Sequence, residues 1–205
     1  MNQAKNYSDE ILRHLTEQSN LIENEPILGP SFETHWRATL LVRTAAEEKT
    51  LLHPRVLHQL LYEDLPITNV HGTPTDALKP GYYRPYNLHA YVIQERGGPK
   101  HFFAAPSEVP RLMSTWWIKA EESVWFGSPN LRNEGTRWNF HAWFEAIHPF
   151  VDGNGRVGRL LWWNMAMLMT KEIEIVTYDE RVDYYERLER WRDANGNKPD
   201  MNPFR

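Results

Sequence analysis

The chain has 205 residues, of which 41% are hydrophobic and nine are Trp, and its formal net charge is −4 at pH 7. This length and content suit one folded domain, or one domain with a helical extension. A mildly acidic chain without a clustered basic surface is a poor ligand for nucleic acid, so we expect no nucleic-acid partner.

Cysteine is absent from the sequence, which excludes disulfides, a thiolate nucleophile and Cys-ligated metal sites. The N-terminus has no apolar signal core, and no apolar run has the length of a membrane span. These features predict a soluble, cytoplasmic protein with no membrane contact.

The N-terminal quarter has the periodicity of helices. A cap at Ser8 or Asp9 opens a first helix, which ends before Pro26. A second helix is expected from Ser31 and a third after Pro54, because hydrophobic residues recur at three- and four-residue spacing.

The middle of the chain has a different character. Residues 66–81 are rich in Pro, Gly and Thr and are typical of a connector. Strand-like residues at about 82–104 surround a Gly-rich turn at 95–99, which predicts a short β-hairpin. Two strands are marginally stable alone, so we expect the hairpin to pack on helices.

Helical periodicity resumes in the C-terminal half. We expect a helix capped by Ser107, then helices at about 136–147, 155–171 and 179–192. The residues expected to face inward on the last helix are Val182, Tyr185, Leu188 and Trp191. The predicted fold class is therefore mainly α, a helical bundle with one short β-hairpin.

A polar, Gly-rich stretch at 148–159 interrupts two apolar helical segments. Its Gly-Asn-Gly turn at 153–155 can gather backbone N–H groups at a helix start, where the helix dipole favours anions. Arg156 and Arg159 follow with guanidinium groups suited to phosphate oxygens. The stretch is typical of a phosphate-binding site.

Two further residues of this stretch suggest catalysis. Asp152 would repel a phosphate unless a cation such as Mg²⁺ lay between them. His148 can accept a proton at neutral pH, so it is the natural general base for a hydroxyl. Taken singly, each feature also fits a structural role, but together within twelve positions they favour chemistry.

The stretch resembles the Fic signature His-x-Phe-x-(Asp/Glu)-Gly-Asn-Gly-Arg-x-x-Arg. The matching positions are His148, Phe150, Asp152, Gly153, Asn154, Gly155, Arg156 and Arg159. Residues 80–84 and the hairpin are similar to the Fic flap region, so the resemblance extends over about 54–171.

This resemblance implies a Fic-type helical bundle with a hairpin flap. The core would be 54–175, preceded by a helical region at 1–53 with an inhibitory helix at about 8–24. A C-terminal helix and tail would occupy 176–205.

The resemblance also implies a protein adenylyltransferase that moves AMP from ATP to a Ser, Thr or Tyr hydroxyl of a target protein. His148 would deprotonate the hydroxyl, and Asp152 would hold Mg²⁺. The phosphates would be held by Gly153, Asn154, Gly155, Arg156 and Arg159. Val92 and Ile93 of the flap would align the target by strand addition, although the hairpin could also be purely structural.

Residues 19–24 resemble the inhibitory motif (Ser/Thr)-x-x-x-Glu-(Gly/Asn) of Fic proteins. Ser19 and Glu23 fall one turn apart on one helical face. The resemblance implies that Glu23 pairs with Arg159 in place of the γ-phosphate, in the subgroup whose inhibitory helix precedes the core. The alternative is that Glu23 is an ordinary surface residue.

Three readings of the function stay open at this point. Besides AMP transfer, the same residues could remove AMP, with Glu23 positioning a water. A regulatory or toxin–antitoxin module that binds nucleotide with little chemistry is the third. A homodimer is expected from the resemblance alone.

Overall fold

The fold was analysed in a computed structural model, which describes residues 7–63, 65, 79–85, 90–92, 101–126, 134–169 and 172–195. The prediction of a mainly helical chain is confirmed. The elements are α1 (Asp9–Ile22), α2 (Pro30–Glu47), α3 (Pro54–Leu61), β1 (Tyr91–Val92), β2 (His101–Phe102), α4 (Val109–Glu121), α5 (Glu134–Ile147), α6 (Asn154–Leu168) and α7 (Arg181–Ala194).

Local sequence explains where the first helices begin. Ser8 caps α1, and its Oγ accepts a hydrogen bond from the N–H of Ile11 at 3.3 Å. Helix α2 begins at Pro30, one residue before the predicted start, because proline loses no hydrogen bond at the first helical position. Gly29 precedes it with φ 83°, and α3 likewise begins on its proline, Pro54.

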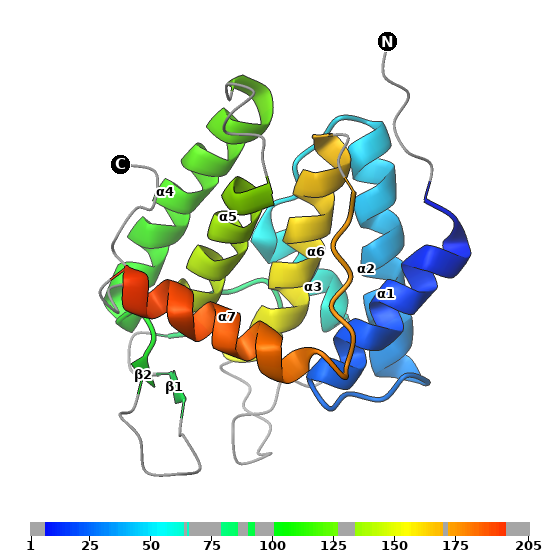
Figure 1. Ribbon diagram of the computed structural model, residues 1–205, viewed down its shortest axis with the longest axis horizontal. Coiled ribbons are helices and arrows are strands. Elements are labelled where there is room, and N and C mark those ends of the chain that lie inside the picture. Colours follow the sequence, from blue (N-terminus) through cyan, green and yellow to red (C-terminus); the bar gives the residue numbers. More distant parts are fainter. Residues whose placement is uncertain are drawn as a thin grey trace.

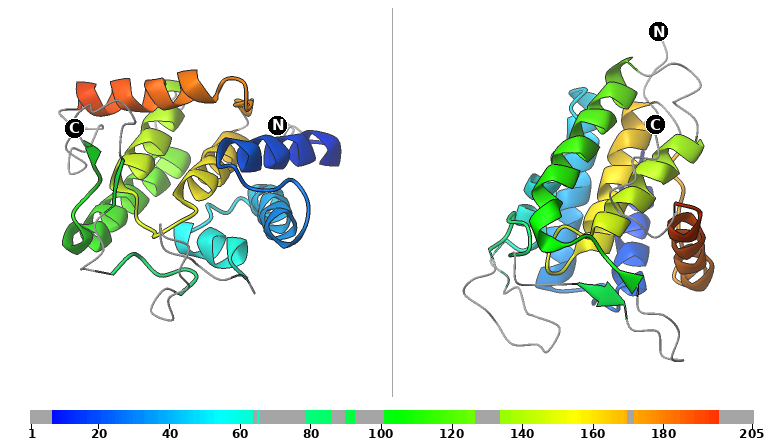
Figure 2. Two further views of the ribbon diagram at one scale, coloured as in Figure 1. Left: turned by 90° about the horizontal axis from the view of Figure 1, so that it is seen from below. Right: turned by 90° about the vertical axis from the view of Figure 1, so that its left-hand side faces the viewer.

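Helix α6 is the central element. Helices α2, α3 and α5 pack against it, and α4 packs on α5 (Figure 1). Nearly every residue of α6 is buried, as expected for a helix that is surrounded on all sides. Viewed from below, α7 and α3 lie on opposite sides of α5 and α6 (Figure 2). The N-terminus of α6 follows directly after the motif loop, so the fold places that loop at one end of the bundle.

Aromatic side chains fill the space between α4, α5 and α6. Trp116, Trp162 and Trp163 are buried, and Trp117 is partly buried against the core. The indole N–H of Trp116 donates to the carbonyl of Phe140 at 2.9 Å, which satisfies its polar atom. The buried amide of Asn164 accepts from the N–H of Leu52 at 2.8 Å, so it ties α6 to the α2–α3 connection.

Two details of the predicted helices are wrong. A 3₁₀ turn at Pro106–Glu108 precedes α4, so Glu108 rather than Ser107 stands at the cap position, without a side-chain hydrogen bond. On α7 the buried stripe is Tyr184, Leu188 and Trp191, whereas Val182 and Tyr185 are exposed. The spacing of four and three places Tyr184, Leu188 and Trp191 on one face, whereas Tyr185 lies at the side of this face and Val182 on the opposite one.

The strands are short. Tyr91 lies opposite Phe102 and Val92 opposite His101 in an antiparallel pair. Ile93 and the rest of the turn lie outside the described residues, as does the side chain of Val92. Tyr82 and Tyr83 are described and are not in a strand. The role of Val92 and Ile93 in a flap therefore stays a prediction. Within the described part of the chain, no helix is both long and apolar enough to cross a bilayer.

Candidate active site

His148 stands where α5 ends. Its N–H still bonds the carbonyl of Phe144 at 2.9 Å, but its φ of 52° is left-handed, and Pro149 follows. Glycine usually takes this position, and another residue there costs about 1–2 kcal/mol. The imidazole stacks on Phe103, with ring centroids 3.9 Å apart and planes 14° from parallel. The base is thus held in a costly backbone conformation and in one ring orientation.

Burial, and to a smaller extent the positive charge of Arg84, lower the pKa of His148 to about 3. The imidazole is therefore neutral at pH 7. Because only the neutral form accepts a proton, His148 is in the state that a general base requires.

The start of α6 has the features of an anion-binding helix terminus. Gly153 precedes the helix with φ 74°, and none of the described side chains caps it. The first N–H groups of α6 therefore lack intrahelical acceptors, and the helix dipole adds partial positive charge. The side-chain amide of Asn154 instead binds both backbone groups of Phe150, at 2.8 and 2.9 Å. Asn154 thus stabilises the loop with its side chain.

Asp152, the residue expected to hold a metal ion, has one carboxylate oxygen bound to the loop backbone. One oxygen accepts from the N–H of Gly153 at 2.7 Å, and the other lies 3.9 Å from Arg156 Nη2. Its side chain is 47% exposed. No group of three potential ligands occurs among the described residues. One open carboxylate fits Mg²⁺, which commonly takes one or two carboxylates and completes its shell with phosphates and water.

Arg156 is buried in a polar network. Its Nη2 donates to the Tyr62 hydroxyl at 2.8 Å and lies 3.3 Å from a carboxylate oxygen of Glu25. Its Nη1 donates to Ser31 at 3.3 Å, and Ser31 in turn donates to Glu25 at 2.9 Å. The α1–α2 connection therefore supplies an acidic partner to the first motif arginine.

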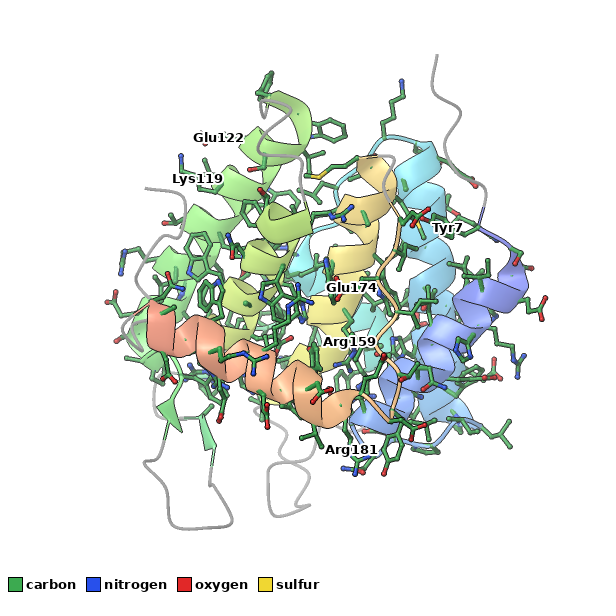
Figure 3. The ribbon with its side chains drawn as sticks, in the orientation of Figure 1. Tyr7, Lys119, Glu122, Arg159, Glu174 and Arg181 are labelled. Carbon is green, nitrogen blue, oxygen red and sulfur yellow. The ribbon has the colours of Figure 1, made fainter. Side chains whose placement is uncertain are left out.

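Arg159 is only 1% exposed and is held by α1. Its Nε donates to the Ser19 hydroxyl at 2.8 Å, and its Nη2 donates to the Ser19 carbonyl at 3.0 Å and to Glu23 at 2.8 Å. Figure 3 shows Arg159 where α6 meets α1 and the start of α7. Burial is the largest single effect and opposes its charge, but Glu23, Tyr184 and Glu145 together outweigh burial and raise the pKa of Arg159.

The Glu23 carboxylate also lies against the start of α6. A Cβ added to Gly155 would come within 2.1 Å of Glu23 Oε1, so only glycine admits the carboxylate there. An acidic side chain thus occupies the space next to the anion-binding N-terminus and to Arg159.

A cavity of about 350 Å³ lies between His148, Glu23 and the start of α6 at Gly155. Its lining residues are Glu23, Phe103, Glu145, His148, Gly155, Tyr184, Tyr185, Leu188, Glu189 and Arg192. Burial raises the pKa of Glu145 to about 8, so this carboxyl is mostly protonated at pH 7 and adds little negative charge. Helix α7 forms one wall of the cavity.

Several residues that build the site were not expected from the sequence. Gly81 donates its N–H to His58 Nδ1 at 2.8 Å, which leaves His58 Nε2 to donate to the Asp152 carbonyl at 3.2 Å. Tyr62 and Glu25 hold Arg156, and α7 covers the cavity. Of Tyr62, Glu25 and α7, only Glu25 could have been suspected from the sequence, because it is an acidic residue two positions after Glu23. His141 of α5 bonds the Tyr184 hydroxyl of α7 at 2.8 Å, so it links these two helices.

The sequence profile of the Fic/DOC family matches residues 53–166, more than half of the chain. The chain belongs to the Fic/DOC family. This Fic domain is 34% identical over 93 residues to a probable protein adenylyltransferase of Aquifex aeolicus, covering 44% of the chain and 26% of that relative. It is 41% identical over 58 residues to protein adenylyltransferase Fic of Nematostella vectensis, covering 28% of the chain and 12% of that relative. The alignments thus span a small part of the curated relatives.

Solved structures of the same family share the fold. A Fic domain containing signaling protein from Bacteroides thetaiotaomicron superimposes with a TM-score of 0.73 at 17% identity, over 95% of this chain and 78% of that one. A Fic family protein from Desulfovibrio desulfuricans G20 gives a TM-score of 0.60 at 23% identity, over 93% of this chain and 60% of that one. At identities of 17% and 23%, this similarity shows a common fold and nothing about function.

The Gly153 turn can be tested by stability. Gly153 and Gly29 both have positive φ, but a Cβ on Gly153 would lie 2.8 Å from the Tyr62 ring, whereas a Cβ on Gly29 would contact nothing within 4 Å. We expect Gly29→Ala to lower the free energy of unfolding by about 1–3 kcal/mol through backbone strain alone, because φ 83° with ψ −169° is adopted essentially only by glycine. Gly153→Ala should cost about 1–3 kcal/mol more, because the aromatic ring must move. Urea unfolding followed by circular dichroism measures both, and equal losses would show that the turn does not depend on this close packing.

Proposed function

We propose that this Fic domain is a protein adenylyltransferase that transfers AMP from ATP to a Ser, Thr or Tyr hydroxyl of a target protein. One observation carries the proposal: a neutral imidazole and an uncapped, anion-binding helix start line the same cavity. The buried Arg156 and Arg159 lie on the same helix start. The names of the two curated relatives agree with this function.

The proposed reaction needs one base and several charge partners. His148 takes the proton of the target hydroxyl, and the hydroxyl oxygen attacks the α-phosphorus. The bond from that phosphorus to the oxygen bridging to the β-phosphate breaks, and pyrophosphate leaves with the electron pair. Catalysis then rests on positioning and on stabilisation of negative charge, as is usual in phosphoryl-type transfer.

The start of α6, the two arginines and Asp152 would bind the triphosphate. The N–H groups at the start of α6 donate hydrogen bonds to the phosphate oxygens, and Arg156 neutralises the leaving pyrophosphate. Arg159 binds the γ-phosphate once its partner has left. Asp152 would hold Mg²⁺, which supplies charge stabilisation to the phosphates when it is bound.

We further propose that α1 inhibits this activity. Glu23 pairs with Arg159 at 2.8 Å and lies against Gly155, so its carboxylate takes the place of a phosphate group. ATP would then bind without its γ-phosphate on Arg159 and without a productive alignment at His148. The ion pair between Glu23 and Arg159 supports the proposal that the protein belongs to the Fic subgroup whose inhibitory helix precedes the core.

Removal of AMP is a second candidate function. The observation that favours it is the position of the Glu23 carboxylate, which lines the same cavity as His148. There Glu23 could orient a water while His148 returns a proton to the target hydroxyl. Under this reading, the loss of Glu23 abolishes the reaction instead of releasing it.

The first prediction for this function concerns the base. His148→Ala should abolish transfer of α-labelled AMP to protein while ATP binding persists, because the base acts on the target hydroxyl. Radiolabelled ATP measures transfer, and calorimetry measures binding. His14→Ala, a change at an exposed histidine of α1, is the control and should transfer normally. Near-normal transfer by His148→Ala would remove His148 from the mechanism.

The second prediction concerns the metal. Asp152→Asn should lower the Mg²⁺-dependent rate by more than about 100-fold, since a bound metal contributes several kcal/mol to charge stabilisation. The asparagine keeps the oxygen that accepts from Gly153, so the loop should fold normally by circular dichroism. If transfer survives both this change and chelation by EDTA, then Asp152 does not hold a metal ion.

The third prediction concerns the inhibitory contact. Glu23→Gly should raise the transfer rate by roughly 5- to 150-fold, the range of typical coupling between sites. Adding Arg159→Ala should erase the gain, because ATP needs the released guanidinium. Glu48→Gly is a matched control, since Glu48 ends α2 as Glu23 ends α1 but is exposed. An unchanged rate in a folded Glu23→Gly protein would refute inhibition, and loss of AMP removal would favour the second candidate.

A further inference from the structure

Arg84 is a buried arginine that lies outside the motif loop. It belongs to the described segment 79–85, which precedes the short strands, and its side chain is 3% exposed. Burial lowers the pKa of Arg84 to about 10, which still leaves it charged at pH 7. A buried cation needs strong partners, and those of Arg84 are backbone carbonyls near the catalytic base.

The contacts of Arg84 converge on His148. Its Nε donates to the His148 carbonyl at 2.8 Å, and its Nη2 donates to the Ile147 carbonyl at 3.4 Å. Nη2 also donates to the carbonyl of Ala104, just beyond β2. The backbone N–H of Arg84 donates to the Pro149 carbonyl at 2.9 Å. One residue therefore fixes three consecutive carbonyls around the base.

We propose that Arg84 is a positioning residue that sets the place of His148 and links it to the end of β2. The proposal deepens the function proposed above and rests on it for the identity of the base. Arg84 does not contact the reacting atoms; it acts through the backbone and the ring of His148.

The backbone of His148 gives the first reason. A histidine in the left-handed region is held there only if the surrounding structure fixes it. The carbonyls of Ile147 and His148 belong to the end of α5, where helical carbonyls lose their intrahelical partners. A guanidinium offers several donors in one rigid plane and can satisfy such a group of carbonyls, whereas a lysine ammonium cannot match that geometry.

The ring of His148 gives the second reason. Phe103, on which the imidazole stacks, directly precedes Ala104, whose carbonyl binds Arg84. The same guanidinium therefore orients the backbone of the base on one side and the stacking residue on the other. Any shift of Arg84 moves both supports of the imidazole together.

The rest of the segment supports the loop at a second point. Through its hydrogen bond to Gly81, His58 is oriented so that it can donate to the Asp152 carbonyl. Residues 81–84 thus support both ends of the turn, by direct contact at His148 and through His58 at Asp152. The segment works as a brace for the loop, with Arg84 as its contact to the base.

The test uses Arg84→Lys and Arg84→Gln in the uninhibited Glu23→Gly protein. A misplacement of a catalytic group by about 1 Å can cost about 100-fold. We expect kcat to fall about 10- to 100-fold in Arg84→Lys and further in Arg84→Gln, while KM for ATP changes by less than about twofold. Arg111→Lys, at an exposed arginine paired with Glu108, is the control and should keep its kcat.

A second measurement does not depend on activity. The stacked Phe103 ring should shift the imidazole proton signals of His148 upfield in the NMR spectrum. Those signals should move toward their unstacked positions in Arg84→Gln and stay in place in Arg111→Lys. Arg84→Lys keeps the charge and a donor, so it provides a folded variant if Arg84→Gln unfolds.

The outcomes separate the two proposals. Unchanged imidazole signals in a folded Arg84 variant would overturn the positioning role, and so would an unchanged kcat or a rise in KM that matches the fall in kcat. If the Glu23→Gly parent transfers no AMP, the proposed function fails, and the NMR shifts alone then decide whether Arg84 positions His148.

Discussion

The buried guanidinium of Arg159 is the constraint on which the arrangement of this domain depends. A charge that is almost fully removed from water must be paired and hydrogen-bonded, or the fold loses several kcal/mol. The partners come from α1, through Ser19 and Glu23, and the Tyr184 hydroxyl of α7 lies 3.5 Å away. Both helices lie outside residues 53–166, the part matched by the family profile. The flanking helices thus complete the charge balance of the motif helix.

Arg156 follows the same rule one turn earlier on α6. Its acidic partner, Glu25, lies two residues after Glu23, so one short stretch neutralises both motif arginines. The rest of α1 docks with a mixture of contacts. Thr16 bonds Thr39 and Asn20 bonds His35, beside the buried Leu12 and Leu15. Polar contacts of this kind fix the register of a helix more strictly than apolar packing does, because a shifted helix would leave them unsatisfied.

The features that could be predicted from the sequence are those whose residues lie close together along the chain. The base, the carboxylate and the arginines are readable because they fall within twelve positions, and the prolines predicted the starts of α2 and α3 within one residue. Contacts between distant segments were not readable. Arg84 lies 64 residues from His148, and His58 lies 94 residues from Asp152. The side-chain role of Asn154 also escaped prediction, because a motif gives residue types and not the direction in which an amide points.

The position of Glu23 has a consequence for how the site would respond to its substrate. A carboxylate on the chain is a tethered competitor, and a short tether gives it an effective concentration in the millimolar range. Under the proposed function, free nucleotide must outcompete this internal anion before Arg159 changes partner. Activity would then depend on cellular ATP in a graded way even without a separate signal. Any partner that moves α1 away from α6 would lower the effective concentration of the Glu23 carboxylate. Less ATP would then be needed for activity, so binding of the partner would switch the enzyme on.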